Sequence, residues 1–184
     1  MSLVDYIGHM MSTSIEKFAT LDFEASSLSP HGWPIEIGLS WIEHGSLQTW
    51  SSLICPDPAW DPADWSPQSA AVHGIPMTDL ETAPPATQVA ESFLRVLGDR
   101  RLVSDAPEFE MRWLSRLLQV NGCERMPRIE DFDGISFALF EGFALDMLYE
   151  TLERRPAPHR AGPDSARLAG AWLKATAYNL SPVR

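Results

Sequence analysis

The stretch that most constrains this chain is residues 18–28, where an apolar run leads directly into two carboxylates at alternate positions, Asp22 and Glu24. Successive side chains of a β-strand point to opposite faces, so these two acids would share one face. Ionised carboxylates are costly to bury without a partner, and their hard oxygens suit Mg²⁺ or Mn²⁺. The stretch therefore predicts a metal site at the end of a core strand. The alternative is an edge strand with one face in water, and the pattern alone does not decide between them.

Composition limits what surrounds such a site. The chain has 184 residues, of which 45% are hydrophobic, and this is typical of one compact α/β domain. Its formal net charge is -11. Binding along a nucleic-acid duplex depends largely on Lys and Arg, so this balance argues against a protein that grips long duplexes. It leaves open an enzyme that holds a short nucleic-acid end through metal ions.

Cysteine usage and hydropathy favour a cytoplasmic protein. Cys55 and Cys123 offer neither a disulfide framework nor zinc-ligand spacing, which fits a reducing cytosol. The sequence shows no signal peptide and no apolar run of the ~18 residues that span a bilayer, so no membrane partner is expected. A Gly-His-Met sequence precedes a second methionine, Met11. We therefore interpret residues 1–14 as a leader or disordered N-terminus and residues 15–180 as the domain.

The order of the expected elements predicts a mixed central sheet flanked by helices. Residues 17–25, 35–42 and 47–54 read as three strands of an antiparallel meander. A short buried strand at 102–103 leads into a helix that begins near Pro107. Residues 124–134 read as a polar connection, residues 135–152 as one buried helix, and a closing helix starts near Pro163. Strands first, then alternating helix and strand, describe a single α/β domain.

More acids follow at two later positions. Asp105, Glu108 and Glu110 lie where the strand at 102–103 passes into the next helix. Asp164 opens the closing helix, whose N-terminus favours a negative side chain. His159 lies five positions earlier in a loop of Pro and Gly, from which it could reach a site that Asp164 helps to form.

Taken in order, these motifs resemble those of the DEDDh 3′–5′ exonucleases, the DnaQ-like branch of the RNase H superfamily. The order is Asp22-x-Glu24, then Ser-Asp-Ala-Pro-Glu-Phe-Glu at 104–110, then His159 followed by Asp164. The sequences His-Gly-Ile at 73–75 and Ile-Glu-Ile-Gly at 35–38 are also similar to family motifs. The resemblance runs from about residue 17 to 175. It implies a single RNase H-like domain that removes nucleotides from the 3′ end of single-stranded or short nucleic acid.

The resemblance also implies roles for individual residues. Asp22 would bridge two divalent cations, Mg²⁺ or Mn²⁺, and Glu24 and Asp164 would ligate the ion on the nucleophile side. His159 would be the general base that takes a proton from water.

The second acidic motif departs from the family pattern. The family usually ends this motif in Phe-Asp or Tyr-Asp, whereas here the pair is Phe109-Glu110. Glu110 is therefore the expected ligand of this motif. Asp105, at a position where many relatives carry asparagine, is its rival.

Contacts with the substrate follow from the same resemblance. The terminal nucleotide would be held by the residues after the first motif together with one residue of the second, namely Ala25, Ser26, Ser27, Leu28 and Phe109. Trp33 could stack on a base, with packing as the preferred interpretation. Glu36 and His73 are interpreted as a solvated strand residue and a structural turn residue. Candidate phosphate contacts, each otherwise a solvated helix charge, are Arg112, Arg160 and Arg167.

Two other classes stay open, a nucleic-acid-binding module of the same fold with weakened catalysis and a structural or assembly subunit. The complete pair of His159 and Asp164 argues against both. The sequence leaves open whether the chain forms a homo-oligomer and whether it prefers DNA or RNA.

Overall fold

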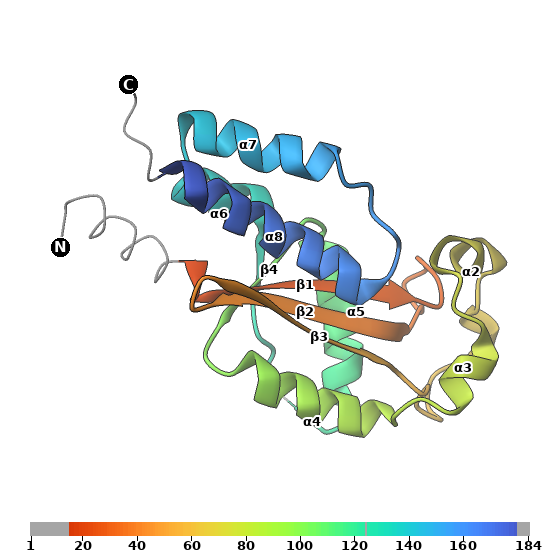
Figure 1. The fold of residues 1–184 in the computed structure, drawn as a ribbon. Helices are drawn as coiled ribbons and strands as arrows, with labels where there is room; N and C mark the ends of the chain where they lie inside the picture. The colour runs from red at the N-terminus through yellow and green to blue at the C-terminus, as the bar shows by residue number, and fades with distance from the viewer. Residues whose placement is uncertain (1–14, 124, 180–184) are drawn as a thin grey trace.

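A five-stranded sheet forms the centre of the computed structural model, which describes residues 15–123 and 125–179 (Figure 1). Its strands are β1 (Phe18–Ala25), β2 (Pro34–Glu43), β3 (Ser46–Leu53), β4 (Arg101–Ser104) and β5 (Ile129–Asp131), in the order β3-β2-β1-β4-β5. The pairs β1–β2 and β2–β3 are antiparallel, whereas β1–β4 and β4–β5 are parallel. The predicted mixed sheet is therefore confirmed. The leader expected at residues 1–14 lies outside the described residues.

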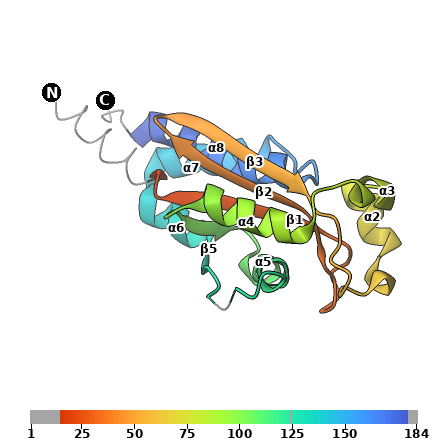
Figure 2. The same ribbon diagram turned by 90° about the horizontal axis from the view of Figure 1, so that it is seen from below.

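Helices cover both faces of the sheet (Figures 1 and 2). On one face α8 (Ala161–Asn179) crosses β1, β2 and β3, and α7 (Gly142–Glu153) and α6 (Phe132–Leu139) lie beside it. On the other face lie α4 (Ala86–Leu97) and α5 (Pro107–Gln119). Beyond the end of β1 lie a 3-10 turn η1 (Pro62–Asp64) and the short helices α2 (Pro67–His73) and α3 (Met77–Glu81).

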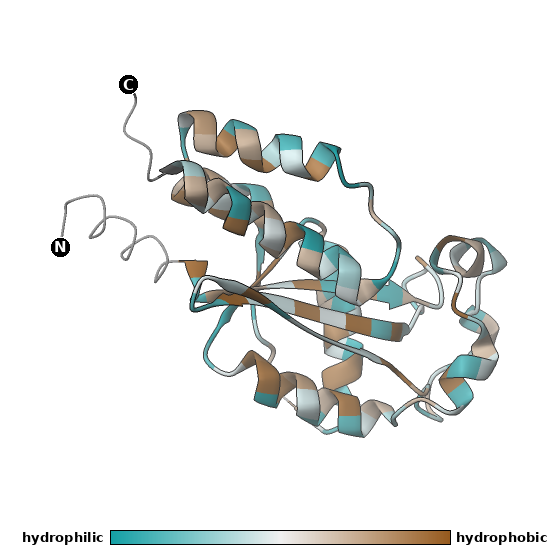
Figure 3. Cartoon of the chain, in the orientation of Figure 1, coloured by the Kyte–Doolittle hydropathy of each residue, from teal (hydrophilic) through white to brown (hydrophobic). Residues whose placement is uncertain are grey.

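The alternation of side chains along β1 separates the apolar core from the polar residues. Leu21 and Phe23 are buried in the larger core cluster together with residues of α4 and α5. On the opposite face, the Thr20 hydroxyl donates a hydrogen bond to the carbonyl of Ser165 in α8 at 2.7 Å. Asp22 and Glu24 follow Thr20 at the period of two that a strand imposes. Figure 3 shows apolar and polar residues interspersed along both the strands and the helices.

Two expectations about the second half of the chain are wrong. Residues 124–134, expected to be a polar connection, contain β5 at its parallel edge position. Residues 135–152, expected to be one helix, are divided between α6 and α7. The chain turns extended at Phe140 and enters α7 through Gly142, whose φ is +52°. The break buries Phe140 in the second core cluster, with Trp172, and this packing outweighs continuation of the helix.

Candidate metal centre and active site

The first turn of α8 lies directly against the sheet because β2 carries a glycine there. A Cβ atom on Gly38 would lie only 2.0 Å from the carbonyl oxygen of Ala161, so any other residue would push the helix away. The hydroxyls of Ser40 and Ser165 lie 2.9 Å apart and hold the next turn in place. Gly38 pairs with Asp22 across the sheet. The close contact therefore places the start of α8 beside the acids of β1.

Three acids from two distant parts of the chain meet at this point. Oxygen atoms of Asp22, Glu24 and Asp164 all lie within 4.8 Å of one another. Asp164 lies in the first turn of α8, and its Oδ2 accepts a hydrogen bond from the backbone N–H of Arg160 at 3.0 Å. Its Oδ1 is buried and accepts no hydrogen bond from any described residue. This spacing and these free oxygens are what a hard divalent cation requires.

Glu110 joins these acids from α5. Its side chain is 3% exposed, and its Oε2 has no hydrogen-bond partner within the described part of the chain. Burial raises the pKa of Glu110 well above its usual range, and the charges of Asp22, Asp105 and Glu24 raise it further, while a Phe23 backbone N–H opposes the shift. Such an acid is stable as an anion only if a cation lies beside it.

The pKa values of the β1 acids shift in the same direction. Burial raises the pKa of Asp22 well above its usual range, and the charges of Glu24 and Asp164 add to this effect. The pKa of Glu24 rises to about 7, first through burial and then through Asp164 and Glu36, with Arg160 opposing. The negative charge of the cluster therefore exceeds the positive charge that the nearby arginines supply. A divalent cation would remove the repulsion, so the residues present fit a metal site.

The acids open into a cavity of about 420 Å³. Its polar wall contains Asp22, Glu24, Asp105, Glu110, His159, Asp164 and Arg167, and its apolar wall contains Ala25, Leu28, Val72, Phe109 and Trp113. Leu28 and Phe109 are 67% and 42% exposed and form part of its rim. The structure thus brings together the proposed base, all proposed ligands and three of the proposed substrate contacts.

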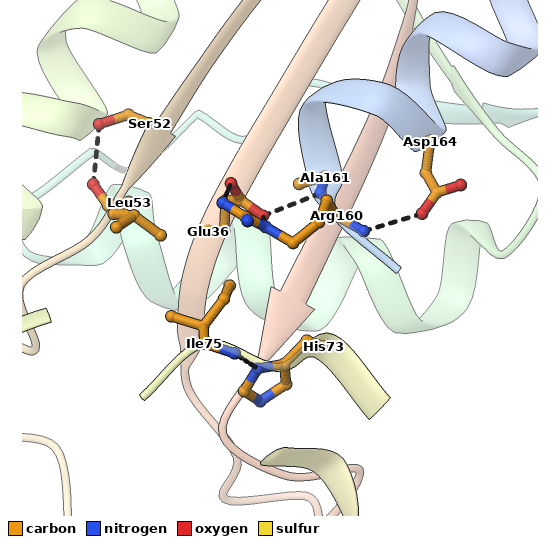
Figure 4. A network of polar contacts seen from close by, with 8 residues as sticks. All are labelled: Glu36, Ser52, Leu53, His73, Ile75, Arg160, Ala161 and Asp164. Atoms are coloured by element: carbon orange, nitrogen blue, oxygen red, sulfur yellow. Dashed lines mark hydrogen bonds and ion pairs between the residues drawn. The ribbon is translucent and has the colours of Figure 1, made fainter. Parts of the chain in front are cut away.

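His159 is exposed and lies just before α8 in the left-handed region, with a φ of +56°. The residues that follow it are held firmly (Figure 4). The guanidinium of Arg160 donates two hydrogen bonds to Glu36, at 2.9 and 2.8 Å, and the N–H of Ala161 donates a third at 3.0 Å. The expectation that Glu36 is solvated is wrong, since it is only 4% exposed. Sequence reasoning missed this anchor because its two sides lie far apart in the chain.

Ser26 and Ser27 do not belong to the cavity lining. The backbone N–H of Ser26 donates to the carbonyl of Trp33 at 2.8 Å, and its hydroxyl accepts from the Trp33 N–H at 2.9 Å. The Ser27 hydroxyl accepts a hydrogen bond from the N–H of Ser29 at 3.2 Å. Both serines are buried and shape the loop that carries Leu28.

Trp33 has the packing role preferred from the sequence, and His73 stabilises a turn while it also lines the cavity. Trp33 is 1% exposed, and its ring centre lies 6.1 Å from that of Trp60 and 5.9 Å from that of Trp65. His73 Nδ1 accepts a hydrogen bond from the N–H of Ile75 at 2.9 Å, and burial lowers its pKa. Both residues therefore stabilise the segment that contains η1 and α2, beside the cavity.

The sequence did not point to Val72 and Trp113 as cavity residues. Trp113 could have been found, because it lies one helical turn after Phe109 and the two rings are 6.0 Å apart. Val72 is 55% exposed on α2 and had no signal beyond its position next to His73. Arg112, a candidate phosphate contact, points its guanidinium at the carbonyls of Leu28 and Ser29, each at 3.5 Å.

Comparison with known proteins identifies the fold. No protein-family model and no curated protein matches the sequence. The nuclease domain of 3′hExo, a DEDDh family member bound to rAMP, superposes with a TM-score of 0.61 at 17% identity, over 85% of this chain and 89% of that one. Exonuclease X in complex with 5′-overhanging duplex DNA has a TM-score of 0.57 at 20% identity, over 88% and 92%.

A third structure, E. coli exonuclease I with a dA16 oligonucleotide, has a TM-score of 0.60 at 14% identity and covers 85% of this chain but 40% of that one. The chain therefore has the RNase H-like fold of the DEDDh 3′-exonucleases, which confirms the fold expected from its motifs. None of the described helices combines the length and hydrophobicity that a membrane crossing requires.

Proposed function

We propose that this protein is a metal-dependent 3′–5′ exonuclease that hydrolyses phosphodiester bonds at the 3′ end of single-stranded or short nucleic acid. The observation that carries the proposal is the meeting of Asp22, Glu24 and Asp164 within 4.8 Å of one another in the cavity that His159 lines. The fold adds support, because similar structures are those of 3′-exonucleases. The free thiols Cys55 and Cys123 suit the reducing cytoplasm in which we expect it to act.

In this proposal Asp22, Glu24, Glu110 and Asp164 would hold two Mg²⁺ or Mn²⁺ ions. Asp22 would be shared by both ions, Glu24 and Asp164 would ligate the ion on the nucleophile side, and Glu110 would ligate the other. When bound, such a pair of ions activates a water molecule and stabilises the departing oxygen. The unpartnered oxygens of Glu110 and Asp164 support this assignment, because they offer lone pairs that no described residue uses.

His159 then takes the proton of the attacking water. Its side chain is exposed, and its backbone lies in a loop with a φ of +56°, next to the firmly held Arg160. Its ring can therefore move while its backbone attachment stays close to the acids.

The apolar wall of the cavity would hold the terminal nucleotide. Leu28 and Phe109 line the cavity and are exposed enough to contact a base, and Ala25, which follows Glu24 in sequence, lines it as well. Ser26 and Ser27 would support this wall through the loop. Solved relatives of the fold carry a stem-loop RNA, an overhanging duplex DNA and an oligonucleotide. The net charge of -11 favours a short or single-stranded substrate here.

A labelled single strand incubated with Mn²⁺ tests the proposal. We expect stepwise shortening of a strand with a free 3′ end and none of a strand with a blocked 3′ end. His159→Asn, which tolerates the left-handed backbone, should lower turnover about 10²-fold or more and leave Mn²⁺ binding nearly unchanged. Binding of the strand without cleavage by the wild type would instead favour a nucleic-acid-binding module.

A further inference from the structure

Arg167 places a fixed positive charge among the acids of the site. It follows Asp164 by three residues on α8, and its Nε lies 3.8 Å from Asp164 Oδ1. Its Nη2 lies 3.9 Å from Oδ2 of Asp105. Among the described residues that line the cavity, Arg167 is the one permanent cation. The arginine is therefore part of the site and not a solvated helix charge.

The guanidinium is held by charge and not by hydrogen bonds. Both distances exceed those of a hydrogen bond. The side chain is only 19% exposed, and its buried Nε atom has no hydrogen-bond acceptor among the described residues. Arg160, by contrast, donates hydrogen bonds from its Nε and Nη2 atoms to Glu36. Neither Nη atom of Arg167 forms a hydrogen bond with a described residue, and the side chain lines the cavity, so these donors are left for an anionic ligand.

We propose that Arg167 contacts the scissile phosphate and that Asp105 orients Arg167 instead of binding metal. This inference rests on the proposed function. A planar guanidinium can donate two parallel hydrogen bonds to phosphate oxygens, and it stabilises the charge that develops on them during cleavage. Asp105 is 48% exposed, unlike the buried Glu110, and its one ion pair among the described residues is with Arg167.

Charge balance supports the same division of roles. Asp22, Glu24, Glu110 and Asp164 would balance two divalent cations, which leaves Asp105 as an additional acid. Arg167 compensates for that acid, so the loaded site would be close to neutral before an anionic substrate enters. If Asp105 were the ligand in place of Glu110, the buried Glu110 would be the additional acid, and Arg167 forms no ion pair with it.

Arg167→Met tests the phosphate contact through two effects of opposite sign. Loss of a cation about 4 Å from Asp164 should tighten Mn²⁺ binding about 3- to 10-fold, measured by calorimetric titration without nucleic acid. The same variant should lower kcat for a short oligonucleotide about 10- to 100-fold and weaken binding of a nucleoside monophosphate in the presence of Mn²⁺. Arg167→Lys, which keeps the charge, should show wild-type Mn²⁺ affinity and an intermediate kcat.

A structural role would produce a different result. Weaker Mn²⁺ binding together with a lower melting temperature, or an unchanged kcat, would overturn the phosphate contact. Asp105→Asn should change Mn²⁺ affinity less than 3-fold while lowering kcat, and a loss of more than 10-fold in affinity would make Asp105 a ligand after all. If the wild type neither cleaves oligonucleotides nor binds the monophosphate, the proposed function itself fails. The Mn²⁺ titration still reports separately whether Arg167 opposes metal binding.

Discussion

Glu36 and Glu110 are equally buried glutamates, at 4% and 3% exposure, yet their surroundings are opposite. Glu36 accepts three hydrogen bonds, two from the guanidinium of Arg160 and one from the N–H of Ala161. Glu110 leaves Oε2 without a partner in the described structure, and burial together with acidic neighbours raises its pKa well above the usual range. Within the described residues the first glutamate is neutralised by Arg160, whereas the second has no cationic partner.

The difference shows that burial alone does not reveal what a carboxylate does. A buried polar group that has all its partners stabilises the fold, here by joining β2 to the start of α8. One that lacks partners destabilises the fold, and such groups concentrate where a ligand supplies the missing interaction. Substituting each glutamate should therefore affect stability and activity in opposite ways.

The largest effect is expected on activity, from Glu110→Gln. Removal of one anionic ligand should lower metal-dependent cleavage about 10³-fold, equivalent to roughly 4 kcal/mol of transition-state stabilisation. Single-turnover cleavage of a labelled strand at saturating Mn²⁺ measures this. Glu108→Gln, two residues earlier and exposed on the same helix, is the matched control and should retain wild-type activity. Equal activity of the two variants would remove Glu110 from the site.

The next largest effect is a loss of stability in Glu36→Gln. The substitution leaves Arg160 without its charge partner and weakens the bond to Ala161, at a cost of about 2–3 kcal/mol, because Arg160 is 45% exposed and regains some hydration. Urea unfolding measures the change. Glu43→Gln at the far end of β2, where the ion pair with Arg100 is 48% exposed on the acid side, should cost less than about 1 kcal/mol. Similar losses of unfolding free energy in both variants would show that Glu36 does not anchor the start of α8.

A pH series should sharpen the contrast further. The folded pKa of Glu24, about 7, exceeds its ordinary value of 4.5, so the unfolded chain releases this proton first as pH rises. The metal-free protein should therefore lose about 1–2 kcal/mol of unfolding free energy between pH 4.5 and 7, an amount reduced by solvent screening because Glu24 is only partly buried. The free energy of unfolding measured with EDTA and that measured with Mn²⁺ should move apart as the pH rises through this interval. A rise in the stability of the metal-free protein through this interval would show that the cluster does not carry the excess of negative charge described above.

The smallest effect is a gain of stability in metal-free Glu110→Gln. Replacing a buried, poorly neutralised carboxyl with a neutral amide of similar shape should stabilise the protein by about 1 kcal/mol near pH 8, or roughly 2–4 °C in melting temperature. Calorimetry without metal checks this. A loss of stability comparable to that of Glu36→Gln would mean that Glu110 also has a structural role.

Local sequence was sufficient for much of the fold. Alternation of apolar and polar residues located β1 and its two acids, and Pro107 located the start of α5. The resemblance to the DEDDh exonucleases, and not local geometry, grouped Asp22, Glu24, Glu110 and Asp164 as one proposed site. The strand and helix signals succeed because each depends on residues a few positions apart, where strand and helix geometry act directly.

Only the tertiary structure decided which acids are neutralised and which are not. Glu36 and Arg160 are 124 residues apart in sequence, and Gly38 matters because the start of α8 lies against it. In the same way, the burial of Phe140 broke an apolar run that local periodicity reads as one helix. The sequence by itself determined which charged residues are available at this end of the sheet. Their partners, burial and pKa values depend on contacts between distant segments, and those contacts exist only in the folded chain.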